Sequence, residues 1–493
     1  MSTTQRPAAE QVVLDAVPKQ LYIAGEWRDG AGGETVAVDD PATGETIAEV
    51  ADATPEDALA ALGAAHDTWY GGWRDSAPRD RSDILRRAYE AITDRADDLA
   101  LLMTLEMGKP LGESKAEIAY GASFLRWYSE EAVRLDGRFT MHETGSGRLL
   151  TMKQPVGPCV FITPWNFPLA MGTRKIGPAV AAGCTMVVKP AKLTPLSMLM
   201  LAKILEGCGL PGGVLNVVTA RSSGPVMEPV IRDPRTRKLS FTGSTEVGRK
   251  LIAQSAERVL RVSMELGGNA PFVVFDDADV DDAVKGAMVA KMRNVGEACT
   301  AANRFHVAQP IADEFARKLA AKMEGLKIGR GTEEGVGVGP LIDEEQLEKV
   351  DELVQDAVAK GARLLCGGER VAGPGHFYKP TVLVDVPAGA RLLEEEVFGP
   401  VAPIRAFASE DEAIAAANDT EFGLVAYVYT ADVKRALRVT ERIEAGMVGL
   451  NQGFVSNAGA PFGGIKQSGI GREGGPEGIA EYLDTKYVAL ATD

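Results

Sequence analysis

Apolar residues recur at helical spacing over residues 54–135, for example at Leu59 and Leu62. Thr54-Pro55 is typical of a helix start, because Thr caps free N–H groups and Pro suits the first helical position. This stretch therefore predicts a layer of helices. The fifty residues before it are rich in Gly, Asp and Thr, a composition that predicts strands and turns.

After Gly157 the pattern changes to short apolar runs that alternate with amphipathic stretches. The strand-like runs cover 159–163, 185–189, 214–219 and 238–242, and the helical stretches cover 167–182, 195–207, 224–231 and 245–256. Strands and helices that alternate at this spacing predict right-handed crossovers and a parallel sheet.

A second block with the same pattern begins near Glu265. Its expected strands are 271–275, 304–309, 379–386, 424–429 and 447–451, with a helix over 277–294. A Gly-Ser-Gly turn between two alternating runs predicts a β-hairpin near 137–153, and residues 481–490 predict a further strand. The whole pattern predicts an α/β fold with two doubly wound parallel-sheet domains and a small β-hairpin arm.

Composition narrows the class of protein. The 493 residues are 45% hydrophobic and 25% charged, close to soluble globular averages, which excludes wholesale disorder. The net charge of −16 disfavours binding to nucleic acid or to an acidic membrane surface. The uncharged stretch 154–173 contains four prolines and is no candidate for a membrane helix.

Five scattered cysteines without a C-x-x-C pair, and four distant histidines, predict neither a disulfide framework nor a metal site. The N-terminus lacks the apolar segment of a signal peptide. We therefore expect a reducing, cytoplasmic location.

Candidate chemistry lies at strand ends, where open parallel sheets bind ligands. Asn166 follows the strand 159–163 between two prolines, so its amide is held on a rigid turn and can stabilise an oxyanion. The alternative is an Asn that only satisfies the turn. Lys189 ends a buried apolar run, where an ammonium needs an anionic or polar ligand unless it reaches the surface.

Two further stretches complete the set. Gly243-Ser244 joins a strand to a helix start, a geometry that binds phosphate through free N–H groups. Glu265 ends a strand beside two glycines, and Cys299 follows a helix through a Gly turn. A carboxylate can activate a thiol or a water, so this pair is a candidate nucleophile and base. The alternatives are an inert buried thiol and a salt-bridged acid.

The stretches MELGGNAP (264–271) and GEACTAAN (296–303), whose Glu265 and Cys299 are 34 positions apart, resemble the glutamate and cysteine motifs of the aldehyde dehydrogenase superfamily. The resemblance covers essentially the whole chain. It implies NAD(P)-dependent oxidation of an aldehyde through a Cys299 thiohemiacetal and thioester, with the oxyanion held by Asn166 and the Cys299 N–H. Glu265 would then activate the water that releases the acid.

The same resemblance implies domain roles and a cofactor site. It places cofactor binding in 1–133 and 154–263, catalysis in 264–475, and oligomerisation in an arm of 134–153 and 476–493, with a homodimer or homotetramer as the assembly. The implied cofactor residues are Thr163, Pro164, Trp165, Lys189, Gly243, Ser244, Leu266, Glu396 and Phe398.

One departure from the family pattern concerns the cofactor. Many NAD-preferring members have Glu three residues after the conserved Lys, and here that position is Lys192. An ammonium cannot accept a hydrogen bond from ribose, but it can pair with a 2′-phosphate, and Arg221 can add a second cation. We therefore expect NADP to be preferred over NAD, unless Lys192 is merely a solvated charge.

Three short stretches resemble the succinate-semialdehyde dehydrogenases, in which two arginines and a serine hold the substrate carboxylate. The matching residues are Arg174, Arg293 and Ser456. Two guanidinium groups near a thiol select a short aldehyde with a distal carboxylate, whereas either Arg could instead form a structural salt bridge. Glutarate semialdehyde is an alternative substrate, and a cofactor-free thiol hydrolase is an alternative activity.

Overall fold

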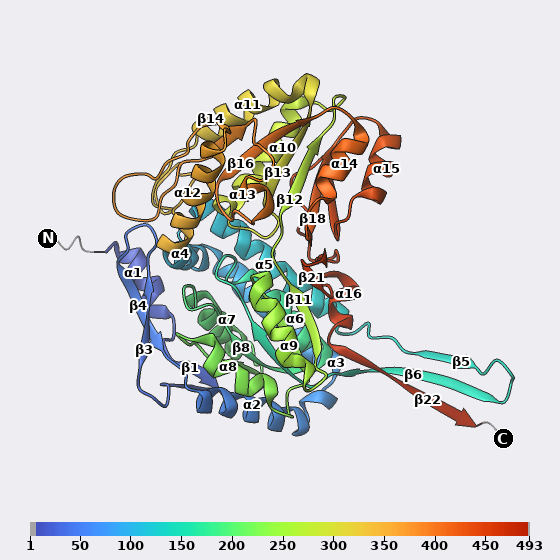
Figure 1. Ribbon diagram of the computed structural model, residues 1–493. Coiled ribbons are helices and arrows are strands. Elements are labelled where there is room, and N and C mark those ends of the chain that lie inside the picture. Colours follow the sequence, from blue (N-terminus) through green and yellow to red (C-terminus); the bar gives the residue numbers. More distant parts are fainter. Residues whose placement is uncertain (1–5, 492–493) are drawn as a thin grey trace.

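The computed structural model describes residues 6–491, which form two α/β domains and a projecting arm (Figure 1). Residues 1–5 of the expected first domain and 492–493 of the expected arm lie outside the described residues. The predicted fold class is confirmed.

The first sheet has the strand order β2-β1-β9-β8-β7-β10-β11-β21. Its parallel centre consists of β7 (Pro158–Ile162), β8 (Thr185–Lys189), β9 (Leu215–Val217), β10 (Lys238–Thr242) and β11 (Arg261–Glu265). Antiparallel edges are added by β1 (Leu21–Ile23), β2 (Glu26–Arg28) and β21 (Gly469–Ile470). β21 falls in the expected second domain, yet it completes the first sheet beside Glu265.

Helices cover this sheet because each has an apolar side that is buried against it. The crossover helices are α6 (Ala170–Ala182), α7 (Leu196–Gly207), α8 (Ser223–Arg232) and α9 (Thr245–Ala256). The predicted helical layer consists of α2 (Pro55–Tyr70), α3 (Pro78–Asp94), α4 (Ala96–Met107) and α5 (Leu111–Glu131). Thr54 caps α2 through a capping box, as the sequence indicates.

The second sheet has the order β14-β15-β16-β13-β12-β18-β19, and only β14 (Arg363–Cys366) is antiparallel. The other strands are β12 (Ala270–Val274), β13 (Ala302–Ala308), β15 (Thr381–Val384), β16 (Val401–Phe407), β18 (Val425–Tyr429) and β19 (Met447–Leu450). Its helices are α10 (Val280–Met292), α11 (Ala312–Glu324), α12 (Glu344–Ala359), α13 (Arg391–Glu394), α14 (Glu410–Asn418) and α15 (Val433–Arg442).

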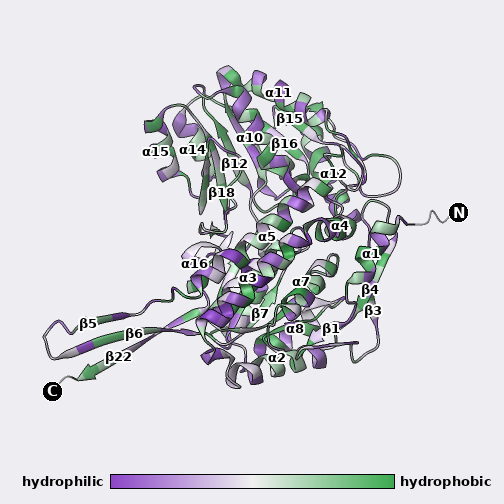
Figure 2. Cartoon of the chain, turned by 180° about the vertical axis from the view of Figure 1, so that it is seen from behind, coloured by the Kyte–Doolittle hydropathy of each residue, from purple (hydrophilic) through white to green (hydrophobic). Residues whose placement is uncertain are grey.

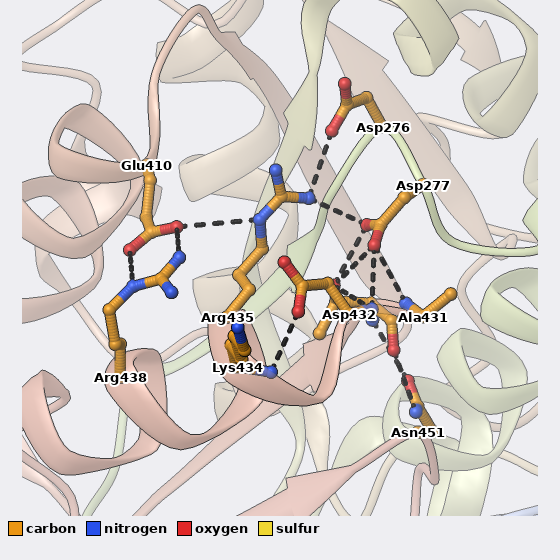
Figure 3. A network of polar contacts seen from close by, with 10 residues as sticks. Asp276, Asp277, Glu410, Ala431, Asp432, Lys434, Arg435, Arg438 and Asn451 are labelled. Atoms are coloured by element: carbon orange, nitrogen blue, oxygen red, sulfur yellow. Dashed lines mark hydrogen bonds and ion pairs between the residues drawn. The ribbon is translucent and has the colours of Figure 1, made fainter.

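Ion pairs fasten α14 and α15 to the end of β12 (Figure 3). Arg435 contacts Asp276 at 3.1 Å and Asp277 at 2.8 Å, and Arg438 pairs with Glu410 at 2.9 Å. Asp277 also accepts hydrogen bonds from the backbone of residues 431 and 432. This cluster lies on the outer side of the second domain and fixes two helices to one strand end.

The arm is a three-stranded antiparallel sheet, β22-β6-β5, built from β5 (Arg138–Met141), β6 (Gly147–Pro155) and β22 (Leu483–Ala491). It projects from the body in both views (Figures 1 and 2). The predicted hairpin and terminal strand thus pair with each other. The short helix α16 (Gly475–Ala480) precedes β22 and packs on α5 and α6.

One helix at the start of the chain differs from expectation. Helix α1 (Ala8–Ala16) lies where strands and turns were predicted, and the prediction was wrong because Val13 and Leu14 pack an apolar side onto the first domain. Two small antiparallel pairs complete the structure: the hairpin of β3 (Thr35–Asp39) and β4 (Thr46–Ala51), and the pairing of β17 (Phe422–Gly423) with the distant β20 (Ile465–Lys466). Across residues 6–491, no helix has both the length and the apolar character that crossing a bilayer requires.

Candidate active site

A cavity of about 200 Å³ lies where the two domains meet, and the three expected catalytic side chains line it. Glu265 comes from the end of β11, Asn166 from the turn before α6, and Cys299 from the segment between α10 and β13. The expected residues Pro164, Trp165, Gly243, Ser244, Leu266, Glu396 and Phe398 also line this cavity.

The Cys299 thiol is partly exposed, unlike the other four cysteines, which are buried and unpaired. Withdrawal from water and the negative charge of Glu265 raise the pKa of Cys299 well above the usual range of a thiol. The thiol is therefore neutral at neutral pH, and a base must remove its proton before it attacks.

Glu265 has the properties that such a base needs. It is 4% exposed, and burial raises the pKa of its carboxyl group, while Arg174 opposes this effect. Neither carboxylate oxygen has a hydrogen-bond partner among the described residues. An unpartnered carboxyl beside a thiol is suited to move protons, because no fixed donor stabilises its charged form.

The amide of Asn166 is 3% exposed and donates one hydrogen bond, from Nδ2 to the backbone oxygen of Glu297 at 3.0 Å. A primary amide has two N–H donors, so the second remains available to a ligand. A thiol, an acid and an amide donor around one cavity can form a covalent adduct at a carbonyl carbon and stabilise the oxyanion that results.

A groove of about 630 Å³ continues from the cavity along the carboxyl ends of β7, β8 and β10. The expected residues Thr163, Lys189, Lys192 and Arg221 line it, together with the start of α9. Ser244 caps α9 through its hydroxyl, which accepts from the N–H of Val247 at 3.4 Å. Free N–H groups and the helix dipole favour an anion there.

Among the described residues, Lys189 and Lys192 have no carboxylate partner, whereas Arg221 also donates to the backbone oxygen of Thr35 at 2.7 Å. Lys189 is 3% exposed and bonds Ser223, and burial together with the charge of Lys192 lowers its pKa to about 8. Arg221 makes a 3.4 Å ion pair with Asp52, with 60% of its side chain exposed. This donor set suits a phosphorylated ligand.

Glu396 and Phe398 come from the second domain and line the cavity. The Glu396 carboxylate accepts from the N–H of Gly268 at 3.1 Å, and burial raises its pKa to about 7. Phe398 has a left-handed backbone (φ 53°) and its ring meets Trp165 edge-on at 5.4 Å. Two aromatic rings and a carboxylate here can hold a flat ring and a ribose.

The three expected substrate residues differ in the contacts that they make. Arg293 donates to the hydroxyl of Ser456 at 3.3 Å, and its guanidinium lies over Phe167 and Phe454. Arg174 is 1% exposed and forms a 2.6 Å ion pair with Glu473, so the structural salt bridge foreseen as an alternative is present. Lys175, the next residue, also pairs with Glu473 at 2.5 Å.

Some residues at or near the site carry no signal in the sequence, among them Tyr120 and Lys349. Tyr120, from α5, is half-buried and lies under Arg293 at 5.8 Å, and burial raises its pKa although Arg174 and Arg293 oppose this effect. Lys349, from α12, lines the cavity. Both are ordinary members of amphipathic helices, so no local pattern distinguishes them.

Comparison with known proteins identifies the family. The aldehyde dehydrogenase family profile matches residues 27–488. Similar proteins include a succinate-semialdehyde dehydrogenase of Paenarthrobacter nicotinovorans (58% identity; 90% of this chain, 99% of that one) and the NADP(+) succinate-semialdehyde dehydrogenase of Escherichia coli K12 (50%; 96% and 98%). A glutarate-semialdehyde dehydrogenase of Pseudomonas putida is 51% identical (96% and 98%).

The fold agrees with a solved structure of the same kind. The crystal structure described as an E. coli NADP dependent enzyme has a TM-score of 0.95 at 50% identity, over 97% of this chain and 99% of that one. The motifs, the strand-end site and the full-length match lead to one conclusion: this chain is a member of the aldehyde dehydrogenase family.

Proposed function

We propose that this enzyme oxidises a short aldehyde with a distal carboxylate, succinate semialdehyde foremost, with NADP preferred as the hydride acceptor. The observation that carries the proposal is the pairing of Arg293 with Ser456, with the Arg293 guanidinium over Phe167, the residue that follows Asn166. A guanidinium and a hydroxyl there would hold the carboxylate and leave the aldehyde facing the thiol. Arg174 would act mainly by its positive charge, since its buried guanidinium is ion-paired with Glu473.

The residues would act in sequence. Cys299 loses its proton to Glu265, and its sulfur bonds the carbonyl carbon while the C=O π electrons move to oxygen. Asn166 and the Cys299 N–H donate to that oxygen. When bound, the nicotinamide cofactor accepts the hydride that turns this adduct into a thioester. Once Glu265 has passed the thiol proton to solvent, its carboxylate takes a proton from the water that attacks the thioester. The adduct then collapses to the acid and the Cys299 thiolate, which regains its proton from Glu265.

Support for NADP comes from the donor set of the groove. Lys189, Lys192 and Arg221 present three positive charges, and none of the described acids is within ion-pair distance of either lysine. A 2′-phosphate would neutralise charge that NAD leaves unpaired. Similar enzymes whose names include NADP support the same preference.

Cofactor preference can be tested by steady-state kinetics with succinate semialdehyde and each cofactor. We expect the higher kcat/KM with NADP, and Lys192→Glu should reverse the order, because a carboxylate repels phosphate and accepts from ribose. A wild-type enzyme that favours NAD would contradict the proposal. Glutarate semialdehyde, named for a similar enzyme, is the second candidate and belongs in the same assay.

Domain roles and assembly complete the proposal. We assign cofactor binding to 1–133 and 154–263, catalysis to 264–475, and oligomerisation to the arm of 134–153 and 476–493. The projecting sheet with two open edges supports a homodimer or homotetramer. Five unpaired cysteines support a reducing location, for which we propose the cytoplasm.

A further inference from the structure

Asn166 is held by buried groups that come from distant parts of the chain. Its backbone oxygen accepts hydrogen bonds from Lys109 Nζ at 2.7 Å and from Asn294 Nδ2 at 3.1 Å. The oxygen of Glu297, which accepts from the Asn166 amide, also accepts from Asn294 Nδ2 at 2.8 Å. Lys109 and Asn294 thereby fix both the backbone and the side chain of Asn166.

Lys109 is fixed in turn by Glu117. The two form a 2.6 Å ion pair with 1% of each side chain exposed. The other Glu117 oxygen accepts from the N–H groups of Leu169 and Ala170, at 3.0 and 3.1 Å, where α6 begins. A buried ion pair seldom stabilises a fold more than an apolar pair of the same size would. We therefore attribute to this pair a role in holding Asn166 in place.

Asn294 is placed by an unusual backbone. Asn294 (φ 53°), Val295 (φ 57°) and Gly296 (φ 79°) are three consecutive left-handed residues. This conformation is costly for a β-branched residue such as Val295, and such strain persists where the surrounding structure requires it. The strained turn directs the Asn294 amide to Asn166 and leads the chain into Cys299.

We infer that Lys109, Glu117 and Asn294 are positioning residues that aim the Asn166 amide at the oxygen of the reacting carbonyl. The inference rests on the proposed role of Asn166 as an oxyanion donor. Such donors act by being fixed before the charge develops, and a displacement of about 1 Å can cost roughly 100-fold in rate. The three residues touch no reacting atom and act only through Asn166.

Two reactions of Cys299 that need neither cofactor nor aldehyde separate this role from a general structural one. Acylation by p-nitrophenyl acetate passes through an oxyanion, as sulfur bonds the carbonyl carbon and p-nitrophenolate then leaves. Alkylation by iodoacetamide forms an S–C bond and releases iodide without any oxyanion. Only acylation should depend on the position of Asn166.

The first variant is Lys109→Met combined with Glu117→Gln, which removes both charges and leaves no unpaired ion. The second is Asn294→Gly, which deletes the amide but permits the left-handed backbone. In each, acylation should slow roughly 10- to 100-fold while alkylation is unchanged. Equal slowing of both reactions, or of neither, would overturn the inference.

A matched control is Glu106→Gln. Glu106 is equally buried, and its carboxylate caps α7 by accepting from Leu196 and Ser197, but it has no hydrogen bond to Asn166. Both rates should stay at the wild-type level, and selective loss of acylation in this variant would count against the inference.

The same variants made in the Asn166→Ala enzyme test whether the three residues act through Asn166. In Asn166→Ala enzyme, the Lys109, Glu117 and Asn294 changes should cause no further loss of acylation, and an additive loss would refute action through Asn166. Wild-type protein that resists the ester altogether would also refute it. Failure of the proposed function would give a different result: the ester would acylate the enzyme normally, but neither cofactor would be reduced in the presence of the aldehyde.

Discussion

At the residue scale, the pKa of the Cys299 thiol depends on one charged neighbour, Glu265. Burial and the Glu265 carboxylate both raise the pKa of the thiol. In Glu265→Gln the negative charge is absent, so the pKa of Cys299 should fall and alkylation by iodoacetamide should begin at lower pH. The pH profile of the alkylation rate measures this shift. Glu246→Gln, which changes an exposed carboxylate on α9, should leave the profile unmoved.

The same substitution should stall the second half of the reaction. At a pH high enough for the Cys299 thiol to ionise without Glu265, the first half still proceeds, but no carboxylate takes the proton of water. The thioester should then accumulate after one turnover, which is visible as a burst of reduced cofactor followed by little steady-state rate. An unaltered steady-state rate would exclude Glu265 as the base.

Arg293 gives the test of substrate class. Arg293→Ala should raise KM for succinate semialdehyde roughly tenfold or more, because a charged hydrogen bond contributes about 1.5–3 kcal/mol. KM for butanal, which has no carboxylate, should change far less. Arg249→Ala removes an exposed guanidinium paired with Glu421 and is a suitable comparison. Equal effects on both aldehydes would remove the basis for a carboxylate-bearing substrate.

At the element scale, β13 carries a buried histidine in the second sheet. Burial and the charges of Arg304 and Arg405 lower the pKa of His306 to about 3. The unfolded chain takes up a proton near pH 6.5, so stability is complete above that pH and declines as pH falls toward 3. As the pH falls from about 7 to about 5, protonation of His306 in the unfolded chain should lower the free energy of unfolding by about 2 kcal/mol.

Denaturant unfolding at both pH values tests this loss. His306→Leu should lose about 2 kcal/mol less than wild type over the same interval, because Leu binds no proton. Equal losses in the two proteins would show that His306 does not set the acid sensitivity.

Sequence patterns located most central strands because their apolar runs are short and bounded by turns. β16 was missed, since Pro403 interrupts an otherwise apolar run, yet the strand is paired with β13 and β15. The strand-end positions of Asn166, Lys189 and Glu265 could be predicted because the strands that they follow are short apolar runs bounded by turns. The contacts of Lys109, Glu117 and Tyr120 were not, because they join residues far apart in the chain and depend on helix packing.

At the scale of the whole molecule, the arm exposes apolar side chains that a single chain leaves in water. Phe139 is 64% and Met141 62% exposed on β5, an open edge. We expect a second copy to cover them. The double change Phe139→Lys and Met141→Lys should shift the mass measured by light scattering to that of one chain. Thr140→Lys, on the alternate face, should not.

A monomeric wild type, or a double variant with unchanged mass, would contradict the proposed assembly. Circular dichroism of the variant should match wild type, since the arm adds little to either core.

The ion pairs of Glu473 bear on the order in which the newly made chain can fold. Arg174 and Lys175 are buried in α6, while their shared counter-ion is made about 300 residues later. Domains usually fold as they leave the ribosome, N-terminal part first. Here the first domain would enclose two uncompensated cations if it closed early, at a cost of several kcal/mol. We therefore expect the first domain to close only during the last tenth of translation, so that the surroundings of Cys299 are completed when synthesis is almost over.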